Sequence, residues 1–344
     1  MLKKIRVEDA IGTILVHDIT EVNLNREFKG RAFKKGHIIT EKDIPKLLNL
    51  GKENLYVLEI AEDELHENDA ALLLAQGIAG NGIHFSDEVS EGKINFYAGR
   101  NGLLRIKVNA LEKFNLLGEV MCATRHNNTL VKKDELVAAT RAIPLIIKRK
   151  VVDTAVKITL DSEKILEVLP LQPLKAGVVI TGNEVYKGRI KDGFEAIITK
   201  KIRILGCTVE NILFAPDNVE IIANHLNNLI ESGTQLIITT GGMSVDPDDV
   251  TRQGIQKIGA KIEAYGSSVL PGAMFLVAYF HDIPILGVPA AALHYKITVF
   301  DLILPRILAG EKIGRAEIAK LGHGGLCKDC RKCVYPLCYF GKGS

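Results

Sequence analysis

One loop of the sequence combines glycines, hydroxyl groups and carboxylates. Thr239-Thr240-Gly241-Gly242-Met243-Ser244 runs into Asp246-Pro247-Asp248-Asp249. Glycines let backbone N–H groups approach a ligand without a Cβ in the way, and the hydroxyls with a following helix N-terminus favour an anion such as phosphate. The carboxylates then need a cation, and Mg²⁺ bound by Asp246 and Asp249 against the phosphate meets both needs. The alternative is structural: the glycines make a tight turn and the aspartates cap the next helix.

A second chemical feature is a run of four cysteines close to the C-terminus: Cys327, Cys330, Cys333 and Cys338. Their short spacing lets successive sulfurs turn toward one metal, and four thiolates suit tetrahedral Zn²⁺ or an iron–sulfur cluster. Basic residues lie between them and would stabilise thiolates. The alternative is a flexible tail with redox-labile thiols.

The elements that must position the first loop lie in residues 171–312, where strands alternate with capped helices. We expect strands at 175–181, 209–214, 235–240, 261–265, 275–280 and 283–288, and helices at 192–205, 217–231, after Asp249 and at 292–309. Such βα repeats imply a largely parallel sheet covered by helices on both faces, an α/β domain. Ligands of these sheets bind outside the carboxyl ends of the strands. This predicts that the loops at 181–184, 240–249 and 287–291 meet.

The remaining chain is expected to form two β-rich domains and a tail, with boundaries at 1–60, 61–170, 171–312 and 313–344. In the first domain we expect strands at 10–16, 36–39 and 55–58 and a helix at 41–50 that Thr40 and Asp43 cap. In the second, of uncertain fold, we expect a helix at 69–77 and strands at 93–98, 103–108 and 142–147. Asn101-Gly102 would close a hairpin there.

Composition excludes several classes of protein. The chain has 344 residues, 47% hydrophobic and 25% charged, with a formal net charge of +3, which is ordinary for a globular protein and too little for a nucleic-acid footprint. No apolar stretch approaches the ~18 residues of a membrane helix, and acidic residues interrupt the basic start where a secretory signal would lie. We expect a cytoplasmic protein that binds neither nucleic acid nor membrane.

Residues 175–310 resemble the molybdopterin-binding domain shared by the MoaB, MogA and MoeA families. The resemblance rests on Thr181-Gly182-Asn183-Glu184, Gly188 to Asp192, Thr240-Gly241-Gly242-Met243-Ser244 with Asp249, Pro271-Gly272, and Pro289 ahead of a terminal helix. Chain length and the β-rich N-terminal half favour the MoeA-type architecture. The implied fold is a MogA-like three-layer domain with a mostly parallel sheet.

The resemblance implies a function and a set of site residues. In these families the domain binds molybdopterin or its adenylylated form, and MoeA-type members insert molybdate with Mg²⁺ and release AMP. Asp249 would be the catalytic residue and, with Asp246, a metal ligand. The remaining matched residues would bind the cofactor: Thr181, Gly182, Asn183, Glu184, Asp192, Thr240, Gly241, Gly242, Met243, Ser244, Pro271, Gly272 and Pro289.

Several positions depart from the MoeA pattern. Asn183 replaces the usual Asp, Gly193-Phe194 replaces Ser-Asn, and Ala273-Met274 replaces Lys-Pro, which removes a lysine that would contact the anion. Ala290-Ala291 stands where Gly-Asn is usual. These changes put molybdate transfer in question while the phosphate-binding features remain.

Three functions therefore stay open. The first is a role in molybdenum cofactor biosynthesis or delivery, with molybdopterin molybdotransferase activity. The second is a non-catalytic molybdopterin-binding sensor or maturation factor for a molybdoenzyme, and the third a nucleotide pyrophosphatase-like hydrolase. Expected partners are molybdopterin, molybdate, a molybdoenzyme or other cofactor-biosynthesis proteins, and a second copy of the chain in a homodimer.

Overall fold

The computed structural model describes residues 2–23, 28–243 and 250–343. This part of the chain divides into two compact units, and each is described by itself. Unit 1 consists of residues 1–97, 107–124 and 136–166, and unit 2 of residues 98–106, 125–135 and 167–344.

The N-terminal part of unit 1 is a small β structure with short helices. Its elements are β1 (Leu2–Arg6), η1 (Val7–Asp9), β2 (Ile14–Leu15), β3 (Ile19–Asn23), β4 (Phe28–Phe33), η2 (Glu41–Asp43), α1 (Ile44–Asn49) and β5 (Asn54–Leu58). One sheet has the order β1-β5-β2, and β3 pairs with β4. Leu15, Leu47 and Val57 are fully buried in the core of this part.

Sequence signals located the helix of this part better than its strands. The expected helix at 41–50 is present as η2 followed by α1, and the backbone N–H and hydroxyl of Thr40 donate to Asp43 Oδ2 at 2.8 and 2.7 Å. The expected strands at 10–16 and 36–39 were wrong in extent. Only Ile14–Leu15 is a strand, because a turn closed by Thr13 N–H on the Ala10 carbonyl precedes it, and Ile38 forms an isolated bridge with Ile14.

The second part of unit 1 combines a β-sheet with three helices. Its elements are β6 (Glu64–His66), α2 (Glu67–Ile78), β7 (Ile83–Phe85), β8 (Lys93–Ala98), α3 (Val108–Asn115), β10 (Val120–Thr124), β12 (Leu136–Ala142), β13 (Ile146–Lys148) and α4 (Arg149–Asp161). The sheet order is β10-β12-β8-β7, and β13 pairs with β6. The expectation of a mostly β segment missed α3 and α4. The β-branched residues of α4 favour a strand, but its buried Val152, Ala155 and Thr159 follow helical spacing.

The predicted hairpin at Asn101-Gly102 is absent. β8 pairs with β7 and β12, whereas β9 (Gly102–Ile106) pairs with β11 (Thr129–Val131) in the sheet β11-β9-β14, where β14 is Leu166–Leu169. The two strands therefore belong to different sheets. Asn101 Oδ1 accepts a hydrogen bond from Lys133 N–H at 2.9 Å, which links this turn to the segment that follows β11.

Among the described residues, unit 2 is built on a six-stranded sheet with the order β16-β15-β17-β20-β19-β18. The strands are β15 (Lys175–Thr181), β16 (Thr208–Ala215), β17 (Leu236–Thr240), β18 (Lys261–Tyr265), β19 (Leu276–Phe280) and β20 (Ile283–Val288). β16, β15, β17 and β20 are parallel, as predicted, while β19 and β18 are antiparallel. The sheet is therefore mixed, because β19 and β20 are joined by a tight turn.

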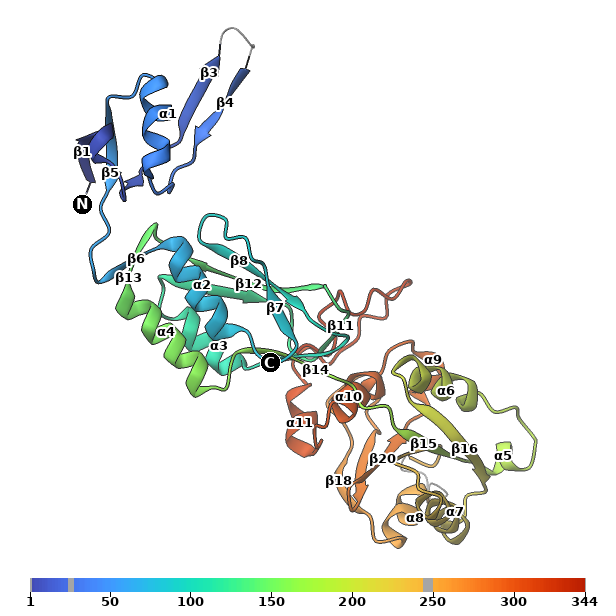
Figure 1. Cartoon of the computed structure of the whole chain (residues 1–344). Coiled ribbons are helices and arrows are strands. Elements are labelled where there is room, and N and C mark those ends of the chain that lie inside the picture. Colours follow the sequence, from blue (N-terminus) through green and yellow to red (C-terminus); the bar gives the residue numbers. More distant parts are fainter. Residues whose placement is uncertain (1, 24–27, 244–249, 344) are drawn as a thin grey trace. The chain divides into compact units, whose positions relative to one another are not determined.

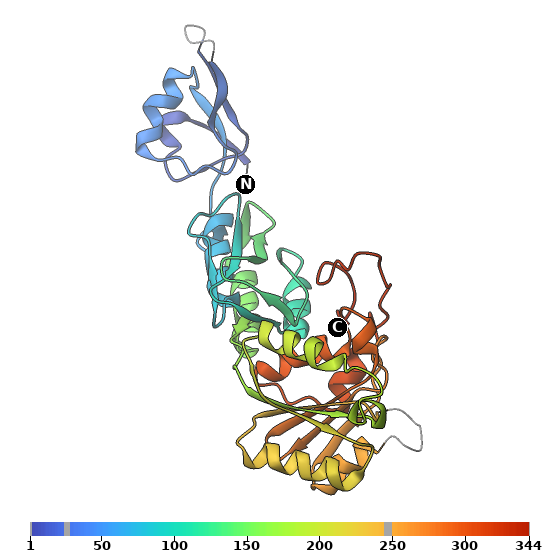
Figure 2. The same cartoon turned by 90° about the vertical axis from the view of Figure 1, so that its right-hand side faces the viewer.

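Helices cover both faces of this sheet. The helices of unit 2 are α5 (Asn183–Tyr186), α6 (Phe194–Ile204), α7 (Val219–Glu231), α8 (Thr251–Lys257), α9 (Ala291–His294), α10 (Val299–Leu308) and α11 (Arg315–Lys320). Figure 1 shows α6, α9 and α10 on one face and α7 and α8 on the other, and Figure 2 shows the same three layers from the side. Consecutive β15 residues serve opposite faces: Val178 packs in the core with Phe300, and Val179 in the core with Leu226.

The long helix expected at 292–309 is broken in two. α9 ends at His294, and α10 begins after Thr298, whose backbone N–H donates to Asp301 Oδ2 at 2.8 Å. This Thr-x-x-Asp capping box is a helix start signal, and it explains why a separate helix begins here. The helix expected at 217–231 begins at Val219, and its N-cap is Asn218.

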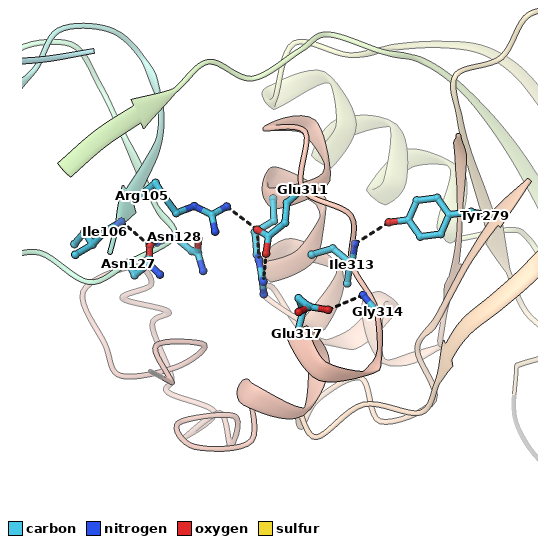
Figure 3. A network of polar contacts seen from close by, with 10 residues as sticks. Arg105, Ile106, Asn127, Asn128, Tyr279, Glu311, Ile313, Gly314 and Glu317 are labelled. Carbon is cyan, nitrogen blue, oxygen red and sulfur yellow. Dashed lines mark hydrogen bonds and ion pairs between the residues drawn. The ribbon is translucent and has the colours of Figure 1, made fainter. Parts of the chain in front are cut away.

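Ion pairs connect the C-terminal end of α10 to the three-stranded sheet β11-β9-β14 of unit 2. Arg105 of β9 donates to Glu311 Oε2 at 2.6 Å, and Arg306 donates to the same carboxylate through Nε and Nη2 at 3.0 and 2.6 Å (Figure 3). Nearby, Ile313 N–H donates to the Tyr279 hydroxyl at 2.9 Å. Within the described part of the chain, none of the helices is long and apolar enough to cross a membrane.

Candidate functional site

The carboxyl ends of neighbouring parallel strands lie together at one edge of the large sheet. Thr240, the last residue of β17, is in register with Ile180 of β15 and Val288 of β20. Thr181 Oγ1 donates to the Thr240 carbonyl oxygen at 3.0 Å and lies 2.9 Å from Thr251 Oγ1. The loops that follow Thr181 and Thr240 therefore start side by side.

The loop that begins at Gly241, directly after β17, is called the central loop. Packing inside the domain requires both of its glycines, Gly241 and Gly242. Gly241 and Gly242 have φ values of 81° and 55°, which side-chain-bearing residues rarely adopt. A Cβ at Gly241 would collide with the Thr181 carbonyl oxygen, and one at Gly242 with Thr251 Oγ1. The contacts with Thr181 and Thr251 therefore require glycine at both positions, as in the tight-turn alternative, and the predicted role of these glycines in ligand binding stays a prediction.

The hydroxyl of Thr240 is a polar group that the described residues leave unused. Thr240 is fully buried, and its Oγ1 has no hydrogen-bond partner within the described part of the chain. Buried hydroxyls are normally hydrogen-bonded. The oxygen lies directly before Gly241, at the strand end where we expected the ligand.

A cavity of about 690 Å³ opens at this edge. Three loops of the domain supply most of its lining: 241–243 after β17, 270–274 between β18 and β19, and 289–291 after β20. Tyr295 and the C-terminal residues Leu326, Cys327 and Asp329 complete it. Its size lies within the ~300–1,000 Å³ range of small-molecule sites.

The cavity gathers part of the predicted site, and other predicted residues serve different roles. The predicted residues that line it are Gly241, Gly242, Met243, Pro271, Gly272 and Pro289, although the Met243 side chain is 4% exposed and packed in the core. Thr181 is buried as an internal link, as described above. Gly182, Asn183, Glu184, Asp192 and the fully buried Thr240 are absent from the described lining.

Asn183 and Asp192 hold backbone groups. Asn183 N–H donates to Asp217 Oδ2 at 2.9 Å, and Asp217 N–H donates to Asn183 Oδ1 at 3.4 Å. The Asp192 carboxylate accepts from the N–H groups of Phe194 and Glu195 at 3.0 and 2.7 Å, the predicted cap of α6. Each side chain has a structural partner in this arrangement.

The predicted metal ligands of the central loop, Asp246 and Asp249, lie outside the described residues, and so does Ser244. Among the residues that are described, the cavity lining contains no Lys or Arg and one carboxylate, Asp329. Ala273, Ala290 and Ala291 do line it, so the departures from the family pattern noted in the sequence lie at the cavity. A phosphate there would depend on backbone N–H groups, hydroxyls and a cation.

Comparison with known proteins assigns the central part of unit 2. Residues 177–309 match the family described as a probable molybdopterin binding domain. The match covers 133 of the 344 residues. Residues 4–59 match a domain of unknown function, DUF8806.

Relatives of the molybdopterin-binding domain are similar over part of their length. A protein of Aeropyrum pernix is 32% identical, over 31% of this chain and 38% of its own. A molybdopterin molybdenumtransferase of Haemophilus influenzae is 28% identical, over 44% of this chain and 40% of its own. The solved structure of MoaB from Thermus thermophilus has 18% identity and a TM-score of 0.35, covering 40% of this chain and 98% of that one. The chain thus spans less than half the length of the Aeropyrum pernix and Haemophilus influenzae relatives. The predicted family resemblance is confirmed.

The residues that follow the molybdopterin-binding domain contribute to its cavity, which we did not predict. Leu326, Cys327 and Asp329 lie beyond residue 309, where the family match ends. Tyr295, 37% exposed, was also missed. No local pattern marks Leu326, Cys327 and Asp329, because their position depends on pairing between Leu270 and Leu326, which are far apart in sequence.

The four C-terminal cysteines are free thiols around one further cavity of about 380 Å³. Cys330 is exposed and the other three are half-buried. Over the described ranges, no three His, Cys, Asp or Glu side chains are already close enough to hold a metal ion. The predicted Zn²⁺ or iron–sulfur site therefore stays a prediction.

Proposed function

We propose that the 690 Å³ cavity binds molybdopterin or its adenylylated form, and that the chain acts in molybdenum cofactor biosynthesis or delivery. The observation that carries the proposal is the position of the cavity, at the carboxyl ends of β17 and β20 inside the molybdopterin-binding domain. Open α/β sheets bind ligands at this edge.

The lining suits the two ends of such a ligand differently. Apolar side chains, including Leu270, Met274 and Tyr295, provide a surface for a flat ring system. At the other end, the phosphate would meet the glycine loop that follows β17, whose Gly241 and Gly242 line the cavity. Since no described lining residue is a cation, Mg²⁺ held by Asp246 and Asp249 would supply the positive charge that phosphate needs.

Two candidate roles follow from binding. In the first, Asp249 and Mg²⁺ support molybdate insertion with release of AMP. In the second, the chain binds the cofactor without turnover, as a sensor or maturation factor. The second role is favoured by Ala273, Ala290 and Ala291 on the cavity wall, because these side chains carry no charged or hydrogen-bonding group that could stabilise charge developing in a transition state.

Anaerobic binding and turnover assays separate these proposals. We expect purified full-length protein to bind molybdopterin with Mg²⁺, and Asp249→Ala to weaken Mg²⁺-dependent binding at least tenfold. Asp282→Ala, an exposed residue between β19 and β20 at the other end of the strand, is the matched control. Absence of binding by the unmodified chain would refute the proposal.

Turnover is read from AMP released by adenylylated molybdopterin on addition of molybdate. Sustained release supports the transferase role, and binding without release supports the second role. The homodimer, the molybdoenzyme partner and a metal on Cys327, Cys330, Cys333 and Cys338 belong to the same proposal, and light scattering and metal analysis of the same sample test them.

A further inference from the structure

The cysteine segment is hydrogen-bonded to the wall of the ligand cavity. Leu270 N–H donates to the Gly325 carbonyl oxygen at 2.8 Å, and Cys327 N–H donates to the Leu270 carbonyl oxygen at 2.7 Å. Leu270 and Leu326 form a parallel bridge. Leu270 directly precedes Pro271-Gly272, so the start of the cysteine segment is paired with a loop of the molybdopterin-binding domain.

Both ends of this segment are anchored. Gly341 N–H donates to the Gly324 carbonyl oxygen at 3.0 Å, which brings the two ends together. Phe340 is 2% exposed and packs in the same core as α10, and Tyr335 packs against that core. Residues 325–340 therefore form a closed loop that carries all four cysteines.

The loop is shared by two cavities. All four cysteines line the 380 Å³ cavity, and Cys327, Asp329 and Tyr295 line both this cavity and the 690 Å³ ligand cavity. Cys330, Cys333 and Cys338 line only the smaller one among these two. Cys327 thus borders the ligand cavity, and the other three cysteines border only the smaller of the two.

We propose that a thiolate-bound metal centre on Cys327, Cys330, Cys333 and Cys338 forms one wall of the ligand cavity, so that metal loading strengthens ligand binding. The chemistry shared by Zn²⁺ and an iron–sulfur cluster is coordination by four thiolates. Each thiol loses its proton when it binds the metal. Lys328, Arg331 and Lys332, which line the same cavity, favour the thiolates and offset their charge.

Coupling follows from the geometry. The thiols are not yet arranged as a ligand set, and metal–sulfur bonds are only about 2.3 Å long. Loading must therefore draw the four thiols together and fix the loop that carries Cys327 and Asp329. A wall fixed before the ligand arrives costs less entropy on binding. By linkage, the ligand must strengthen metal retention by the same factor.

The test uses full-length protein and the variant Cys333→Ser, which removes a metal ligand without altering the lining of the ligand cavity. Leu337→Ser is the matched control, because Leu337 is 89% exposed in the same segment and lines neither cavity. Metal content and absorbance spectra of anaerobically purified protein distinguish Zn²⁺ from an iron–sulfur cluster. We expect Cys333→Ser to lose the metal and bind molybdopterin at least tenfold more weakly, and Leu337→Ser to match the parent.

This inference rests on the proposed function, so a second readout is independent of the ligand. Hydrogen exchange at the Leu270 and Cys327 N–H groups should slow at least tenfold when the metal is loaded into parent protein and not in Cys333→Ser. A metal-free parent, or unchanged exchange on loading, overturns the metal-dependent wall. Slowed exchange with no molybdopterin binding supports the wall and refutes the ligand assignment alone, while equal affinity in Cys333→Ser and parent refutes the coupling.

Discussion

Thr181 Oγ1 and Thr251 Oγ1 lie 2.9 Å apart, and the same Thr181 hydroxyl donates to the Thr240 carbonyl oxygen. Thr251 Oγ1 also lies 3.1 Å from the Gly241 carbonyl oxygen. Two hydroxyls from separate elements thus hold the strand end and the first glycine of the central loop. The ends of β15, β17 and α8 are joined by side chains in addition to the sheet hydrogen bonds.

Replacing Thr181 by Val should destabilise unit 2 through these bonds. The side chain is 4% exposed, and removal of one partner from buried hydrogen bonds costs about 1–3 kcal/mol. Urea unfolding followed by circular dichroism measures the change. Thr208→Val, at an exposed position in β16, should change stability by less than about 0.5 kcal/mol; equal effects of the two substitutions would contradict the role of Thr181.

Alanine substitutions at two glycines separate the stability cost of backbone strain from the cost of a steric clash. Gly241 and Gly259 have nearly equal φ values of 81° and 82°, but a Cβ at Gly259 meets nothing within 4 Å. Gly259→Ala should therefore cost only the left-handed backbone penalty, about 1–2 kcal/mol. Gly241→Ala should cost a further ~1–3 kcal/mol because it overpacks the site against Thr181. Thermal and urea unfolding measure both, and equal losses would show that the loop can move away.

Local signals in the sequence predicted the elements of the large sheet better than their partners. Capping residues such as Asp192 and continuous apolar runs such as 175–181 depend on neighbours in sequence, and the structure has both. The hairpin predicted at Asn101-Gly102 is absent because β8 and β9 each pair with other strands and so belong to different sheets. The Leu270–Leu326 bridge could not be predicted at all, since nothing in either segment marks the other as its partner.

Acid should weaken unit 2 through Glu311. Burial of this carboxyl works to raise its pKa, but hydrogen bonds and charges from Arg306 and Arg105 outweigh it and hold the pKa at about 2, against an ordinary value of 4.5. Because the folded-state pKa is the lower one, the stabilisation is complete above about pH 5 and is lost as pH falls toward 2, and amounts to about 3 kcal/mol.

Urea unfolding at pH 6 and pH 3 measures this contribution. Glu311→Gln should be less stable than the parent at pH 6 and should lose less stability between pH 6 and pH 3. Glu231→Gln, at an exposed position that ends α7, should keep the pH dependence of the parent. A parent and Glu311→Gln with parallel pH profiles would show that the arginine pair does not act on this carboxyl.

Asp192 distinguishes a helix cap from a ligand-binding residue. The family resemblance assigns it to the cofactor, but its carboxylate accepts from Phe194 and Glu195 N–H, and it is absent from the described lining of the ligand cavity. Asp192→Ala should therefore cost about 1 kcal/mol of stability, as loss of an N-cap does, and leave the Kd for molybdopterin unchanged. Asn218→Ala removes the corresponding cap of α7, where Asn218 Oδ1 accepts from Glu220 and Ile221 N–H, and should behave alike in both assays. If Asp192→Ala weakened binding tenfold while Asn218→Ala did not, the carboxylate would contact the ligand, and the loop that carries it would have to close over the cavity.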